Sequence, residues 1–262
     1  MNLFSLKEKT ALVTGGTHGL GMAIGKALGK AGAHVIITSH SSEHKLNTAV
    51  ESFKGDNLTC SGYMLDVNDE KQVQDVLSKI DNEVGNIDIL VNNAAIIKRV
   101  NLVDMELADW NQVITTNLTG TFLMSKHVVK RMIDQKRVGK VINMCSMMSE
   151  LGRDTVSAYA AAKGGLKMLT RNMATEWAKF GIQANGIGPG YFATEQTAPI
   201  RKDGHPMNEF IINRTPAGKW GDPDDLGGAA VFLASKASDF VNGQVIYVDG
   251  GILATIGKPY DN

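Results

Sequence analysis

The sequence predicts an α/β fold in which a doubly wound parallel sheet of about seven strands is flanked by helices on both faces. Short runs of β-branched and other apolar residues alternate with longer stretches of helical spacing. Each run is continuously apolar, which is typical of strands buried on both faces of a parallel sheet. A glycine-rich turn joins the first run to the first helical stretch, as in doubly wound folds.

The apolar runs and the spacing between them place the expected elements along the chain. We expect strands at 10–14, 34–39, 87–93, 139–146, 182–190 and 244–251. Apolar residues at helical spacing predict helices across 19–33, 70–85 and 155–181, and the last two stretches end at glycine. No linker or change of composition divides the 262 residues, so we expect a single domain, 1–262.

Charge and composition exclude several classes of function. The chain carries 27 basic and 27 acidic side chains without a basic stripe, so we expect no nucleic-acid partner. No stretch approaches the roughly 20 apolar residues of a membrane span, and the first ten residues lack an apolar signal region. Cys60 and Cys145 form no CxxC motif, which favours a reducing compartment. We expect a cytoplasmic protein without a membrane partner.

A metal site is not expected either. His40 and His44 have the i, i+4 spacing of two ligands on one helix face, but no third ligand lies nearby and the surrounding "SHSSEH" is polar. Cys145 sits in an apolar run, where a cysteine is more often a small buried residue than a nucleophile.

The turn after the first strand has the composition of a dinucleotide site. The stretch "TALVTGGTHGLGMAIGKAL" passes from a strand into a helix through Gly15, Gly16, Gly19 and Gly21. Glycine allows the backbone to approach a pyrophosphate, and the helix N-terminus then meets the negative charge. The TGxxxGxG spacing at 14–21 departs from the GxGxxG form. These features predict a Rossmann-type nucleotide fold.

Several motifs in order resemble the short-chain dehydrogenase/reductase family over nearly the whole chain. They are TGxxxGxG at 14–21, "LDV" at 65–67, "NNAA" at 92–95, Asn117, Ser146, YxxxK at 159–163, "PG" at 189–190 and "VDGG" at 248–251. Ala95 departs from the glycine usual in the family and adds a methyl group beside the cofactor. The resemblance implies a single-domain enzyme that transfers hydride to or from a nicotinamide cofactor.

The resemblance also implies the catalytic residues: Asn117, Ser146, Tyr159 and Lys163. Tyr159 and Lys163 are four residues apart and therefore share one helix face. A free phenol has a pKa of about 10, and a neighbouring ammonium stabilises its phenolate form. In the family pattern Tyr159 exchanges the proton, Ser146 binds the carbonyl oxygen, Lys163 also holds the nicotinamide ribose and Asn117 anchors a chain of water.

The expected cofactor is NADP, with NAD as a possible second cofactor. No acid follows the second strand to accept a ribose 2′-OH; Ser39 and His40 stand there, and His18 adds positive charge in the glycine turn. The cofactor-binding residues implied by the resemblance are Gly15, Thr17, His18, Gly19, Leu20, Gly21, Ser39, His40, Asp66, Val67, Asn93, Tyr159, Lys163, Pro189, Gly190, Phe192 and Thr194.

Two stretches, 140–171 and 214–251, resemble the gluconate 5-dehydrogenase (5-keto-gluconate reductase) group of the family. This resemblance implies interconversion of D-gluconate and 5-keto-D-gluconate. A sugar acid needs a cation for its carboxylate and polar groups for its hydroxyls. Lys98 lies beside Arg99 after "NNAAII" as a further cation. The substrate-binding candidates are Arg99, Ser146, Ser149, Glu150, Arg153 and Tyr159.

Other functions remain open at this stage. Related sugar-acid enzymes act on 2-keto-3-deoxygluconate at C5 or on 2-deoxygluconate at C3, and other relatives reduce β-ketoacyl thioesters. The polar "SELGRD" stretch at 149–154 disfavours an acyl groove. A non-catalytic NADP-binding regulatory protein would not need the complete set of catalytic residues. The family resemblance further implies a homotetramer, assembled through the helices that carry Asn117 and Tyr159 and through the "VDGGILATIG" stretch.

Overall fold

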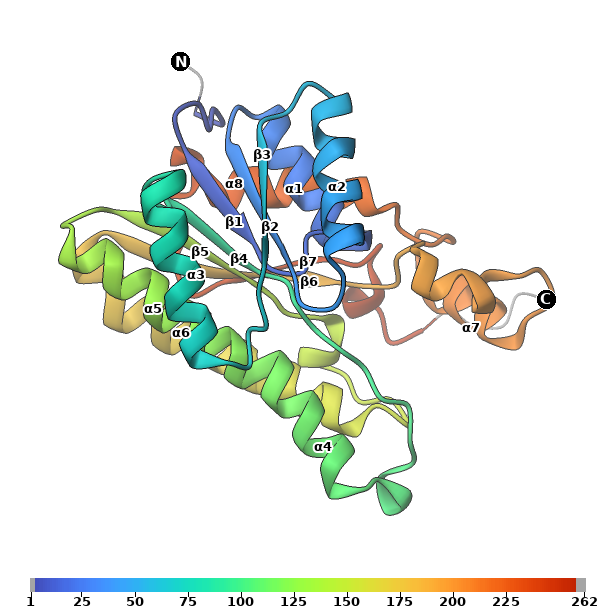
Figure 1. The fold of residues 1–262 in the computed structure, drawn as a ribbon. Helices are drawn as coiled ribbons and strands as arrows, with labels where there is room; N and C mark the ends of the chain where they lie inside the picture. Colours follow the sequence, from blue (N-terminus) through green and yellow to red (C-terminus); the bar gives the residue numbers. More distant parts are fainter. Residues whose placement is uncertain (1–2, 258–262) are drawn as a thin grey trace.

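Seven parallel strands form the centre of the computed structural model, which describes residues 3–257 (Figure 1). Their order across the sheet is β3-β2-β1-β4-β5-β6-β7. The strands are β1 (Thr10–Val13), β2 (His34–Ser39), β3 (Cys60–Met64), β4 (Ile89–Asn92), β5 (Gly139–Met144), β6 (Ile182–Pro189) and β7 (Val245–Val248). The predicted parallel sheet and all six of the strand positions placed from the sequence are confirmed.

The strand that the sequence did not reveal is β3, which forms one edge of the sheet. Its residues, CSGYM, include no β-branched side chain, and only Tyr63 is buried. An edge strand is covered on fewer sides than a central one and does not need a continuous apolar run.

Helices cover both faces of the sheet. On one face α1 (Gly19–Lys30), α2 (Glu43–Gly55) and α8 (Gly227–Ala234) contribute to one apolar core, and on the other α3 (Glu70–Glu83), α5 (Gly120–Asp134) and α6 (Ser157–Trp177) contribute to the second. Strand side chains alternate between these cores, so Ala11 and Val13 enter the first and Leu12 the second.

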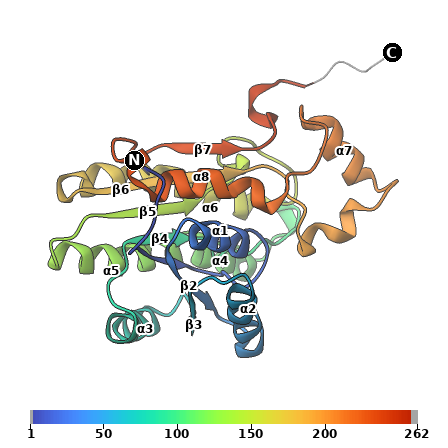
Figure 2. The same ribbon diagram turned by 90° about the horizontal axis from the view of Figure 1, so that it is seen from above.

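Two further helices lie near the carboxyl ends of the strands. Helix α4 (Leu107–Ile114) continues through the π-helical turn Thr115–Thr119 into α5, and the N–H of Gly120 donates to the carbonyl of Thr115. Helix α7 (Pro206–Arg214) stands apart from the two main helix layers, as both Figure 1 and Figure 2 show. No helix within residues 3–257 is long and apolar enough to cross a membrane.

The strand order fixes where a ligand can bind. Strand β1 pairs with β2 on one side and with β4 on the other, so the chain leaves the centre of the sheet in opposite directions from these two strands. Such a switch point leaves a crevice outside the carboxyl ends of the strands. The glycine turn after β1 and Asn93 after β4 therefore meet at that crevice.

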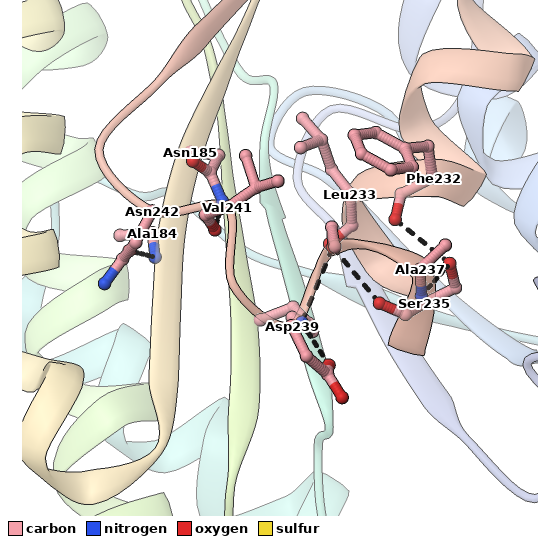
Figure 3. A network of polar contacts seen from close by, with 11 residues as sticks. Ala184, Asn185, Phe232, Leu233, Ser235, Ala237, Asp239, Val241 and Asn242 are labelled. Atoms are coloured by element: carbon pink, nitrogen blue, oxygen red, sulfur yellow. Dashed lines mark hydrogen bonds and ion pairs between the residues drawn. The ribbon is translucent and has the colours of Figure 1, made fainter. Parts of the chain in front are cut away.

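Side-chain amides secure the segment that leads into β7 (Figure 3). Asn185 on β6 donates to the carbonyl of Val241 at 2.8 Å, and Asn242 accepts from the N–H of Ala184 at 2.9 Å. Earlier in the same segment, Ser235 caps the turn after α8 by accepting from the N–H of Ala237. The last strand is thereby held against β6 by specific polar contacts as well as by its ladder.

Candidate active site

A cavity of about 530 Å³ opens at the carboxyl ends of the central strands. Its walls come from the glycine turn after β1, the segments after β4 and β5, the start of α6 and the loop after β6. Segments far apart in sequence therefore contribute to one site, at the location that the switch point predicts.

The glycine turn is held in shape by the residue after β4. The Thr14 hydroxyl accepts from the N–H groups of Asn93 and Ala94, both at 3.0 Å. In return, the Asn93 amide donates to the carbonyls of Thr14 and Gly15 at 2.9 and 3.0 Å. Gly15 and Gly19 have positive φ angles of 62° and 54°, which other residues rarely adopt.

The local geometry fits a dinucleotide pyrophosphate. A Cβ atom on Gly19 would project toward the Thr194 methyl group, 3.8 Å away, and would occupy the gap between the turn and the opposite wall. Helix α1 begins at this point with neither a side-chain cap nor an acidic residue in its first turn. Its N-terminal N–H groups are therefore available to an anion.

Ser146 follows β5 and presents its hydroxyl to the cavity. Its Oγ accepts from the N–H of Met148 at 3.1 Å, so its own hydrogen remains available for another acceptor. Such a hydroxyl can donate to an oxygen atom that gains negative charge during a reaction.

Tyr159 and Lys163 lie one helical turn apart on α6, and both line the cavity. The Lys163 ammonium is 5.5 Å from the centre of the Tyr159 ring. Lys163 is only 3% exposed, and its Nζ donates to the carbonyl of Met144 at the end of β5. The positive charge is thus fixed close to the phenol, an arrangement suited to proton exchange.

Asn117 is buried in the π-helical turn and holds the loop after β4. Its Oδ1 accepts from the N–H of Ile96, and its Nδ2 donates to the carbonyl of the same residue, both at 2.8 Å. π-Helical turns occur frequently at functional sites because they redirect backbone groups. Here the turn links Ile96 in the cavity wall to α5, the helix into which the turn continues.

Comparison with known proteins agrees with this architecture. The protein family described as "Enoyl-(Acyl carrier protein) reductase" matches residues 15–253. The 2-dehydro-3-deoxy-D-gluconate 5-dehydrogenase of Formosa agariphila is 64% identical to this chain, with 99% of this chain and 98% of the relative covered. This chain belongs to the short-chain dehydrogenase/reductase family.

Two solved members of the short-chain dehydrogenase/reductase family resemble it in structure as well. The 2-keto-3-deoxy-D-gluconate dehydrogenase of Streptococcus agalactiae is 51% identical, with a TM-score of 0.84 and 98% of each chain covered. A gluconate 5-dehydrogenase of Burkholderia cenocepacia, solved in complex with NADP and tartrate, is 42% identical with a TM-score of 0.92, and 97% of this chain and 99% of that chain are covered.

The structure of this short-chain dehydrogenase/reductase brings most of the expected cofactor residues to the cavity. Those that line it are Gly15, His18, Gly19, Leu20, Gly21, His40, Asp66, Val67, Asn93, Tyr159, Lys163, Pro189, Gly190, Phe192 and Thr194.

Thr17 and Ser39 are not part of that lining. The Thr17 hydroxyl contacts the neighbouring His18 ring, and Ser39 is buried with its hydroxyl donating to the carbonyl of Ser42. Thr38 lines the cavity in place of Ser39.

The substrate-binding candidates divide into two groups. Arg99 and Arg153 line the cavity together with Ser146 and Tyr159, and Arg153 donates to the Tyr191 hydroxyl at 3.2 Å.

Contrary to expectation, Ser149 and Glu150 lie outside the lining because their side chains bond to α6 and β7 instead. Lys98 does not line the cavity either, and its ammonium pairs with the Asp109 carboxylate at 3.0 Å.

Further residues of the lining were not identified from the sequence. Tyr191, Glu195 and Gln196 follow the Pro189–Gly190 pair, and Gln112 and Thr116 come from α4 and the π-helical turn. Proximity to the Pro-Gly motif could have indicated the first three. The other two are brought in only by the packing of α4, which has no sequence signal of its own.

Cys145 lines the floor of the cavity next to Ser146 but is poorly suited to act as a nucleophile. Burial raises the pKa of its thiol to about 11, outweighing the nearby Lys163 charge that lowers it. The thiol is therefore protonated near neutral pH.

No cluster of metal-ligating side chains occurs among residues 3–257.

Proposed function

We propose that this short-chain dehydrogenase/reductase oxidises 2-dehydro-3-deoxy-D-gluconate at C5 with NADP, and catalyses the reverse reduction. The observation that carries this choice of substrate is the 64% identity, over nearly the full length of both proteins, to a relative of that name. The sequence alone favours D-gluconate and 5-keto-D-gluconate, with this substrate as an alternative. Both reactions interconvert a hydroxyl and a carbonyl at C5 of a six-carbon sugar acid.

In the proposed mechanism, the hydroxyls of Ser146 and Tyr159 bind the reacting oxygen. In the oxidation, Tyr159 removes the alcohol proton, and the Lys163 ammonium stabilises the negative charge on the phenol oxygen. In the reduction, Tyr159 returns the proton while Ser146 donates a hydrogen bond to the oxygen. The nicotinamide, when bound, accepts or supplies the hydride. Asn117 keeps the wall at Ile96 in place throughout.

The proposal of NADP rests on the residues at the end of β2. No acid stands at the end of β2, where one would accept a ribose 2′-OH: Ser39 lies outside the cavity lining, and the exposed rings of His18 and His40 line the cavity. A 2′-phosphate would meet no carboxylate from these positions. The Burkholderia cenocepacia relative, which was solved with NADP, is consistent with this assignment.

D-Gluconate remains the second candidate substrate. It is favoured by the resemblance of residues 140–171 and 214–251 to the gluconate 5-dehydrogenase group and by the structural similarity to the solved member of that group. The two substrates differ at C2 and C3, so the recognition of those carbons separates the candidates.

A panel of sugar acids tests the proposal directly. We expect NADPH formation, followed at 340 nm, with kcat/KM at least about tenfold higher for 2-dehydro-3-deoxy-D-gluconate than for D-gluconate, the order of discrimination that one or two contacts provide. The same assay with NAD⁺ measures the cofactor preference. A reversed order of the two acids would transfer the function to gluconate oxidation. No turnover with any acid of the panel, together with tight NADPH binding, would support a regulatory NADP-binding protein.

Arg99 is proposed to bind the substrate carboxylate. Its guanidinium is exposed at the cavity, whereas the neighbouring Lys98 is already paired with Asp109. Arg99→Ala should raise KM for the sugar acid by roughly 10- to 150-fold, which corresponds to a loss of about 1.5–3 kcal/mol of charge-assisted binding. Lys98→Ala provides the matched control and should change KM little.

The methyl ester of the same acid identifies which interaction has been lost. If Arg99 binds the carboxylate, Arg99→Ala should raise KM far less for the uncharged ester than for the acid. Equal losses on the acid and on the ester would contradict this role.

We further propose a cytoplasmic homotetramer. Phe122 on α5 and Met168 on α6 are 44% and 52% exposed in the single chain, which supports an interface on these helices.

A further inference from the structure

The Ser149 hydroxyl joins the two segments that carry the proposed catalytic groups. It accepts from the N–H of Ser146 at 3.3 Å and donates to the carbonyl of Lys163 at 2.9 Å. Ser146 follows β5, and Lys163 lies on α6. One hydroxyl therefore connects the backbone of the oxygen-binding serine to the backbone of the helix that presents Tyr159.

The hydroxyl has no hydrogen left for the substrate. A serine has a single O–H, and Ser149 uses it on the Lys163 carbonyl. The side chain also lies outside the cavity lining. Ser149 can therefore influence a reaction only through the residues that it holds in position.

Glu150 reinforces the same connection one residue later. Its carboxylate accepts from the Lys167 ammonium and from the Tyr247 hydroxyl. Lys167 lies one helical turn beyond Lys163, and Tyr247 lies on β7. The pKa of the Glu150 carboxyl lies below its ordinary value. The hydrogen bond from Lys167 is the largest cause, and the hydrogen bond from Tyr247 is the second. The charged carboxylate thus ties the turn after Ser146 to both the helix and the edge strand.

We propose that Ser149 is a positioning residue that sets the separation between the Ser146 hydroxyl and the Tyr159 phenol. This inference rests on the proposed function, because it assigns Ser149 to the same reaction. Two hydroxyls can bind one reacting oxygen only when their separation is fixed, and Ser146 and Tyr159 come from different elements. The Ser149 bridge joins the backbones of those elements at Ser146 itself and one helical turn beyond Tyr159.

The first test compares Ser149→Ala with Ser149→Thr. Ser149→Ala should lower kcat by roughly 10- to 100-fold, since a displacement of about 1 Å at a reacting group has an effect of this order. The Kd for NADPH should change little. The Tm should fall by a few degrees, because the N–H of the buried Ser146 loses its partner, and Ser149→Thr should restore most of the rate. Ser78→Ala, which also removes a serine hydrogen bond to a backbone carbonyl but lies on α3, should retain the kcat of the unmodified enzyme.

The second test asks whether Ser149 acts through Ser146. In a Ser146→Ala background, Ser149→Ala should reduce kcat by much less than it does in the intact enzyme, because the group that it positions is already absent. The solvent isotope effect on kcat should rise in Ser149→Ala, since a misplaced proton donor makes proton transfer more limiting. A purely structural role would leave this isotope effect unchanged.

These results separate the inference from the proposed function. A kcat for Ser149→Ala within about twofold of the unmodified enzyme, or full additivity with Ser146→Ala, overturns the positioning role. If Ser149→Ala behaves in this way while Tyr159→Phe is inactive, the inference alone fails. If Tyr159→Phe remains active, the proposed function fails first.

Discussion

Tyr159→Phe should lower kcat by about 10²- to 10⁴-fold, the usual contribution of general acid–base catalysis. The substitution removes one oxygen atom and almost no volume, so the cavity wall remains in place. The Kd for NADPH, measured by fluorescence titration, should be nearly unchanged. The effect is therefore expected in kcat rather than in cofactor binding, because Tyr159 acts on the reacting oxygen.

The control for this prediction is Tyr63→Phe. The Tyr63 hydroxyl donates to Glu83 at 2.9 Å on the edge strand β3, which is separated from β5 by three strands, and its loss should leave kcat intact. Retention of more than about a tenth of the original kcat by Tyr159→Phe would remove Tyr159 from the mechanism.

Asn117→Ala should both destabilise the protein and inactivate it. The substitution leaves the N–H and the carbonyl of Ile96 without their partners. Both bonds are only part-buried, and an unsatisfied buried group costs about 1–3 kcal/mol, so the free energy of unfolding should fall by about 1–3 kcal/mol. The cavity wall at Ile96 would then move, and we expect kcat to fall by about 100-fold, the effect of a displacement of about 1 Å. Urea unfolding and steady-state kinetics measure the two effects.

Asn117→Asp separates the two hydrogen bonds, because aspartate keeps the acceptor for the Ile96 N–H but cannot donate to the Ile96 carbonyl. At neutral pH it should be no more stable than Asn117→Ala, because its buried carboxylate faces the Ile96 carbonyl oxygen, and it should regain stability at low pH, where the protonated group can donate. Asn82→Ala, at an exposed position on α3, should change neither quantity. An Asn117→Ala protein with unchanged unfolding and unchanged kcat would contradict the role assigned to the π-helical turn.

Much of the fold was predictable because it depends on local patterns. The central strands are buried on both faces and must be continuously apolar, so the runs that became β1, β2, β4, β5 and β6 were visible in the sequence. Strand β3 was not visible because its residues, CSGYM, include no β-branched side chain and pack mainly through Tyr63. Amphipathic α3 was found by its periodicity, whereas short α4 offers too few turns for such a pattern.

The sequence motifs predicted which residues belong to the candidate site, but not which contacts those residues make. The motifs led to the cavity residues Ser146, Tyr159 and Lys163, but they did not reveal the partners of these residues. Ser149 was assigned to the substrate from its polarity and position alone. Whether a hydroxyl faces a cavity or a neighbouring helix depends on the packing of β5 against α6, which no local pattern encodes.

The contact between Asn93 and the glycine turn has a consequence for how the protein forms. The amide that secures the turn lies 79 residues after Thr14 and 78 residues after Gly15 in the chain. Closing a loop of this length is entropically costly and slows folding relative to local contacts. During synthesis, β1 and α1 emerge well before Asn93, so the glycine turn cannot reach its final shape until β4 has joined the sheet. Competence to bind a dinucleotide is therefore a late event in folding, although the residues that give the turn its glycines are made well before Asn93.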